Sequence, residues 1–144
     1  MVFAVIFNVI LFVHLFSLVL GMGSGIAMSN IGPLMGQSNA DQRSTLFRLG
    51  DILARNGHVG LGLLWVTGIV LVAMRWSDLG TLSAWFWVKI ALVVVLSASI
   101  GMGSRAYRGI KAGDMASAAL ARRAGMVNAI CGPAIIFCAV MAFN

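Results

Sequence analysis

The chain has 144 residues, of which 60% are hydrophobic and only 10% are charged, and it contains no glutamate. This composition excludes an ordinary soluble globular domain, in which about a quarter of the residues are charged. The formal net charge of +6 comes from basic residues between long apolar runs. We therefore expect these residues to interact with anionic lipid headgroups and not with nucleic acid.

Four apolar runs are long enough to cross the hydrocarbon core of a membrane, which takes about 20 residues in a helix. Backbone polar groups in lipid must find partners within their own segment, so each run is predicted to be an α-helix. We expect one domain, residues 1–144, folded as an all-α, antiparallel four-helix membrane bundle. The spans cover about residues 2–28, 57–74, 84–102 and 124–143, with loops at about 29–56 and 103–123.

The first span carries an ionisable residue, His14, near its middle, where a polar group is costly. Ser17 follows one turn later, and Gly21 and Ser24 continue the same face. This small, polar stripe is predicted to face the interior of the bundle. The His14 imidazole has two interpretations: a hydrogen bond to a neighbouring helix, or a cofactor ligand.

The segment after the first span contains Asn30, Gly32 and Pro33, which are predicted to end the helix. In residues 44–55, apolar residues recur at helical spacing between charged ones. This pattern indicates either an amphipathic helix lying at the membrane surface or an extension of the second span.

The second span is rich in glycine and begins beside His58. Small residues allow a neighbouring backbone to approach closely, and they equally make room for a flat ligand. His58 lies at the predicted membrane boundary, where contact with water is its simplest explanation.

Aromatic residues flank the start of the third span and are predicted to form a belt at the membrane surface: Trp76, Trp85, Phe86 and Trp87. Lys89 lies just inside this belt. Its ammonium group either reaches outward to the lipid headgroups or faces the bundle as a binding residue.

The tetrapeptide Gly-Met-Gly-Ser occurs at residues 21–24 and again at 101–104, which aligns the first span with the third. A shorter match between residues 55–59 and 123–127 aligns the second span with the fourth. The two halves are then repeated helical hairpins related by an axis along the membrane normal. In this alignment His58 and Met126 occupy equivalent positions at the same depth.

Basic residues are concentrated in two of the three connections. The connection between the first two spans has Arg43, Arg48 and Arg55, and that between the last two has Arg105, Arg108, Lys111, Arg122 and Arg123, whereas the remaining one has only Arg75. The positive-inside rule therefore predicts a multi-pass protein with both long loops in the cytoplasm and both termini in the periplasm.

The chain has two histidines, and a haem held by both is disfavoured because their depths differ by roughly 15–20 Å at 1.5 Å per residue. Ligation of haem b by His58 and Met126 is geometrically easier, and His/Met pairs occur in electron-transfer haems. Haem b on His14, alone or with a polar neighbour, is the other arrangement.

Three stretches resemble a known family: residues 12–15 around His14, residues 60–68, and residues 85–93 around Lys89. They resemble the small bacterial four-span proteins grouped around HemJ-type protoporphyrinogen oxidase and the membrane domain of copper-resistance protein D. The HemJ resemblance implies a haem-binding oxidation of protoporphyrinogen within the membrane, with His14 and Lys89 in functional positions. The chain departs from that pattern at residues 101–104, where a further histidine is expected.

Three functions remain open at this point. The first is a haem- or porphyrin-associated redox protein of the bacterial inner membrane, with Lys89 meeting a propionate or a quinone oxygen. The second is a non-enzymatic accessory or scaffold subunit whose glycine faces pack against a second copy or a larger membrane complex. The third is a small metal or solute permease with Met22, Met102, Met126, Cys131 and Cys138 as soft ligands.

Overall fold

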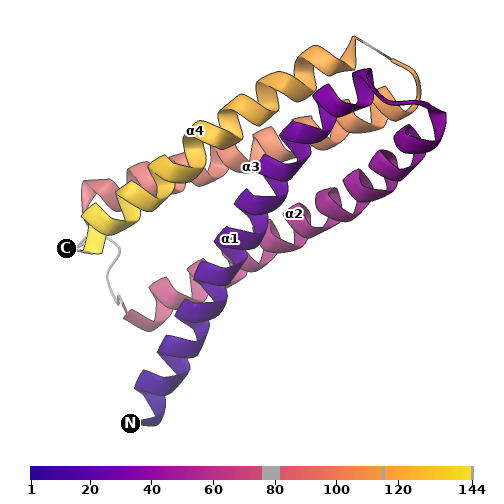
Figure 1. The fold of residues 1–144 in the computed structure, drawn as a ribbon. Helices are drawn as coiled ribbons and strands as arrows, with labels where there is room; N and C mark the ends of the chain where they lie inside the picture. Colours follow the sequence, from indigo (N-terminus) through magenta and orange to yellow (C-terminus); the bar gives the residue numbers. More distant parts are fainter. Residues whose placement is uncertain (76–81, 115, 144) are drawn as a thin grey trace.

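The structure is a computed structural model that describes residues 1–75, 82–114 and 116–143, and these residues form four α-helices and no strand (Figure 1). The helices are α1 (Val2–Gly36), α2 (Ala40–Arg75), α3 (Ala84–Lys111) and α4 (Ser117–Phe143). Each contains an apolar stretch long enough to cross a membrane. The predicted all-α four-helix membrane architecture is confirmed.

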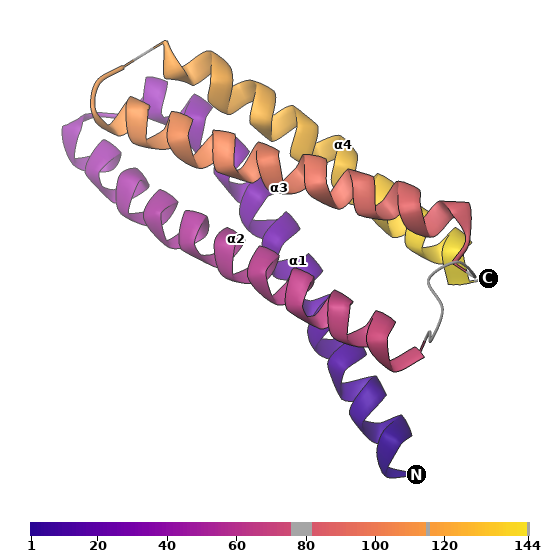
Figure 2. The ribbon, with the colours of Figure 1, turned by 180° about the vertical axis from the view of Figure 1, so that it is seen from behind.

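The helices pack as two antiparallel hairpins, α1 with α2 and α3 with α4. The hairpins meet where α1 contacts α4 and where α2 contacts α3. Both chain termini lie at one end of the bundle, which we call the terminal end (Figures 1 and 2). The opposite end, where residues 37–39 connect α1 to α2 and where α3 leads into α4, is called the loop end.

The prediction that Asn30, Gly32 and Pro33 end the first helix was wrong, because α1 continues to Gly36. Pro33 lies in the last turn of α1, where the lack of its N–H removes a single intrahelical hydrogen bond. A helix that is about to end tolerates that loss.

Residues 44–55 belong to one continuous helix with the second span, so the extension interpretation is the correct one. The start of α2 is fixed by reciprocal hydrogen bonds: the backbone N of Gln42 donates to Asn39 Oδ1 over 2.9 Å, and the backbone N of Asn39 donates to Gln42 Oε1 over 3.0 Å. This capping box satisfies two backbone donors at the helix start. At 36 residues, α2 is about 54 Å long and extends well beyond a hydrocarbon core of about 30 Å.

Small residues bring α1 and α2 into close contact. A Cβ atom on Gly60 would lie 2.9 Å from the backbone N of Gly21 and 2.9 Å from the backbone O of Ser17. The Ser17 side chain is only 1% exposed and donates to the backbone O of Val13, and Ser24 is also buried. The predicted inward orientation of this stripe on the first span is therefore confirmed.

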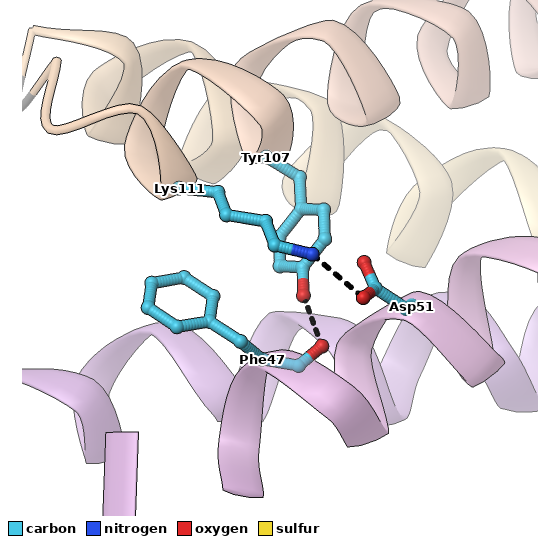
Figure 3. A network of polar contacts seen from close by, with 4 residues as sticks. All are labelled: Phe47, Asp51, Tyr107 and Lys111. Carbon is cyan, nitrogen blue, oxygen red and sulfur yellow. Dashed lines mark hydrogen bonds and ion pairs between the residues drawn. The ribbon is translucent and has the colours of Figure 1, made fainter. Parts of the chain in front are cut away.

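Polar contacts join α2 to α3 at intervals of seven residues, which is two helical turns. Trp65 Nε1 donates to Ser97 Oγ over 3.1 Å, His58 Nε2 lies 3.4 Å from Ser104 Oγ, and Lys111 Nζ forms an ion pair with Asp51 Oδ2 at 2.7 Å. Seven residues closely match two turns of an α-helix, so successive contacts lie along one seam. Figure 3 shows its loop-end part, where Tyr107 also donates to the backbone O of Phe47.

The buried apolar cluster comes from α2, α3 and α4 and consists of Leu64, Val93, Leu96, Cys131 and Ile135. Helix α1 contacts α4 through residues 22–29, and its N-terminal part diverges from the other hairpin (Figure 2). Apolar side chains near the start of α1 are largely exposed in the protein alone. In a membrane this face meets lipid, so its exposure is compatible with stability.

Candidate functional site

The side chain of His14 is held by α2. Its Nδ1 lies 2.8 Å from Thr67 Oγ1, and Thr67 Oγ1 lies 2.6 Å from the backbone O of Leu63. The carbonyl can only accept, so the single hydroxyl proton of Thr67 goes to Leu63 and His14 Nδ1–H donates to Thr67 Oγ1. This assignment follows from heavy-atom distances, and it leaves Nε2 as the ring nitrogen that Thr67 does not contact.

Gly68 makes room for the His14 ring. A Cβ on Gly68 would lie 3.3 Å from His14 Cε1, which is tighter than most real contacts of this kind. The partly buried imidazole therefore lies between the hydroxyl of Thr67 and the bare backbone of Gly68. The contact of His14 with Thr67 and Gly68 could not be predicted from the sequence, because the sequence does not give the register of α1 against α2.

Lys89 lies in the same half of the bundle as His14. Its Nζ lies 5.3 Å from the ring centroid of Phe86, which is buried. We call His14, Thr67, Gly68 and Lys89 the terminal-half site. It combines an imidazole with an ammonium group from a different helix. In the predicted aromatic belt, Trp76 lies outside the described residues.

His58 lies far from this site. The residues that contact His14 on α2 are nine and ten positions beyond His58, which is about 14 Å along the helix axis. Its Nδ1 donates to the backbone O of Ala54 over 2.7 Å. The structure therefore does not bring the two histidines together, in agreement with the argument from depth.

Met126, the predicted partner of His58, is on α4, which lies diagonally across the bundle from α2. Its side chain is 53% exposed, and it does not line the open pocket beside His58. Among the residues that the structure describes, no three His, Cys, Asp or Glu side chains gather where they could hold a metal ion. Cys131 and Cys138 are buried free thiols.

A small cavity of about 20 Å³ lies where α1 meets the other three helices, and its wall includes Ser17, Gly21, Gly60 and Asn128. Asn128 Oδ1 is buried and has no hydrogen-bond partner among the described residues. A buried unpaired polar atom costs free energy because it has lost its contacts with water. This amide is therefore a local weak point in the packing.

Replacing Asn128 with leucine, which has the same branching and the same number of side-chain heavy atoms, is expected to raise the midpoint of thermal unfolding in detergent. The change removes an unpaired amide oxygen whose burial costs about 1–3 kcal/mol. Circular dichroism at increasing temperature measures the shift. Asn30→Leu, at an exposed position on α1, is the control and should leave the midpoint unchanged. A lower midpoint for Asn128→Leu would contradict the assignment.

The fold and composition together define the class: a multi-pass α-helical membrane protein whose apolar spans hold one partly buried histidine and one lysine. Comparison with family models, curated proteins and solved structures finds no match for this chain.

Proposed function

We propose that the protein is a haem- or porphyrin-associated redox protein of the bacterial inner membrane, with His14 as its ligand to iron. The hydrogen bond between His14 and Thr67 carries this proposal. Histidines that bind metals usually donate their other ring N–H to an acceptor, which fixes the tautomer and the ring orientation. His14 has this arrangement, and its Nε2 is left as the donor atom.

The surroundings of His14 fit haem b in the chemistry of their donors. The imidazole is partly buried in an apolar span, and Lys89 provides a positive charge in the same half of the bundle for a propionate. When bound, haem supplies one-electron chemistry that the side chains of this protein lack. The role of the protein is then to hold the iron through His14 and to keep water away with α1 and α2.

The resemblance to HemJ-type proteins implies functional positions for the same residues, His14 and Lys89. The contacts of His58 and Met126 give less support for a role of these residues as iron ligands. His58 is engaged by Ala54 and Ser104, and Met126 is on the diagonal helix. Iron is therefore assigned to His14 alone among the candidate ligands.

The orientation in the membrane is part of the proposal. The loop end carries most of the basic residues of the chain, including both arginines of the α4 start, Arg122 and Arg123. Cytoplasmic segments near membrane spans are enriched in Lys and Arg. We place the loop end in the cytoplasm and both termini in the periplasm.

Replacing His14 with alanine is expected to abolish the haem spectrum. The wild-type protein, expressed with ample haem and purified in mild detergent, should show a Soret band and sharp α and β bands after dithionite reduction. His58→Ala is the matched control and should retain these bands, because His58 lies about 14 Å along α2 from the residues that contact His14. Absorption spectra of oxidised and reduced samples measure the effect.

Two results would contradict the proposal: a wild-type spectrum without haem bands, or an unchanged spectrum in His14→Ala. The first of these would favour a second candidate function, a non-enzymatic accessory subunit. One observation supports that candidate: a Cβ on Gly32 or Gly36, which lie one turn apart on the same face of α1, would meet no atom within 4 Å. Small residues on an open helix face allow close packing of another membrane helix.

A further inference from the structure

An open pocket of about 360 Å³ lies between α2 and α3 toward the loop end. His58, Ser104, Arg105 and Arg108 form its polar wall, and Ala98, Gly101 and Met102 form its apolar wall. The pocket occupies the seam of polar contacts between these helices, at the His58–Ser104 contact. It shares no residue with the terminal-half site.

The positive charge of this pocket is not neutralised within the described part of the chain. Lys111, the next basic residue on α3, is paired with Asp51 (Figure 3), and Asp114 accepts from the Ser117 hydroxyl. Across residues 1–75, 82–114 and 116–143, neither Arg105 nor Arg108 forms an ion pair or hydrogen bond with a carboxylate. The two arginines are three residues apart and share one helix face.

The walls of the pocket differ in polarity along the helix axis. Ala98, Gly101 and Met102 fall inside the predicted span of residues 84–102, whereas Ser104, Arg105 and Arg108 fall beyond it. The pocket therefore crosses the predicted boundary between hydrocarbon and headgroups. A Cβ on Gly101 would meet no atom within 4 Å, so this glycine leaves space in the apolar wall.

We propose that this pocket binds a phosphate group through Arg105 and Arg108, with an attached apolar chain lying along Ala98 and Met102. Guanidinium groups form paired, charge-assisted hydrogen bonds with phosphate oxygens. The hydrogen bond from His58 to Ala54 holds the imidazole in the polar wall, on the α2 side of the pocket. The phosphate comes either from an anionic phospholipid or from a soluble phosphate ester. The site is independent of haem binding at His14.

The test uses the full chain in uncharged detergent, with phosphatidylglycerol, phosphatidylcholine, inorganic phosphate and glycerol 3-phosphate as probes. Native mass spectrometry counts bound lipid, and titration gives each affinity. Arg105→Gln/Arg108→Gln removes the cations, and Gly101→Leu fills the apolar wall without changing charge. The matched controls are Arg122→Gln/Arg123→Gln, with the same charge change on α4, and Gly62→Leu, at another glycine with open space.

We expect phosphatidylglycerol to bind more tightly than phosphatidylcholine. Arg105→Gln/Arg108→Gln should weaken phosphatidylglycerol binding about tenfold more than its control, the scale expected for lost charged hydrogen bonds. Gly101→Leu should weaken it more than Gly62→Leu, because it occupies the space for the apolar chain. Competition by inorganic phosphate or glycerol 3-phosphate at the same residues identifies a soluble ligand, and its absence identifies the lipid. Equal affinities for the two lipids, or equal losses in pocket and control variants, would overturn the proposal. Circular dichroism confirms that each variant is folded.

Discussion

Gly60→Leu is expected to prevent α1 from docking on α2. Even a Cβ at this position would lie 2.9 Å from the backbone of α1, and backbone atoms cannot move aside as a flexible side chain can. Gly60→Ala should therefore lower the free energy of unfolding by about 1–3 kcal/mol, the usual cost of overpacking. The helix propensity gained by losing a glycine offsets up to about 1 kcal/mol of this cost. The bulkier leucine should have a larger effect.

Unfolding by sodium dodecyl sulfate titration, followed by circular dichroism, measures both Gly60 variants. Gly62→Leu is the control, because Gly62 is on the same helix and its Cβ would meet open space. It should be neutral or slightly stabilising, as expected for replacing a glycine in a helix. Equal stability of Gly60→Leu and Gly62→Leu would show that α1 and α2 do not approach each other at this point.

Gly50→Ala is the second substitution with a large expected effect, and it acts on the contact between α2 and α3. A Cβ on Gly50 would clash with the Tyr107 hydroxyl and would lie 2.7 Å from Tyr107 Cζ. The Tyr107 ring is buried, and its hydroxyl is bound to the backbone O of Phe47 over 2.6 Å, so the ring has little freedom to move (Figure 3). We expect a loss of about 2 kcal/mol in the free energy of unfolding.

A double-mutant cycle with Tyr107→Ala tests the cause of that loss. Without the tyrosine ring, Gly50→Ala should be neutral or should stabilise the protein by up to about 1 kcal/mol through helix propensity. The difference between the two backgrounds is the interaction energy of the pair. The same loss in both backgrounds would mean that Tyr107 does not restrict position 50.

The candidate site shows how much the sequence could predict. The position of His14 within an apolar span, with Ser17 and Ser24 on an inward face, was predictable because polar residues in lipid turn toward the bundle. The hydrogen-bond partner of His14 was not predictable. Thr67 and Gly68 become its neighbours only through the register of α1 against α2, which close contact at Gly60 fixes.

The alignment of the two repeats placed His58 and Met126 at the same depth, but equal depth does not make two residues neighbours. Which helices are adjacent depends on how the hairpins pack, and α2 and α4 lie across the diagonal. In the structure the neighbour of His58 is instead Ser104 of α3. The equivalence of the repeats remains a prediction.

By itself, the sequence determined the class and the number of spans, because apolar runs of this length in lipid must form helices to satisfy their backbone. Only the tertiary structure decided where α1 ends beyond Pro33, that α2 is continuous from Ala40, and which faces of the helices meet. Apart from the small, polar stripe of α1, glycine and apolar residues occur on most sides of these helices, so no other face is marked for burial. Rotation and register are set instead by contacts between helices far apart in the sequence, such as those at Gly60 and Gly50.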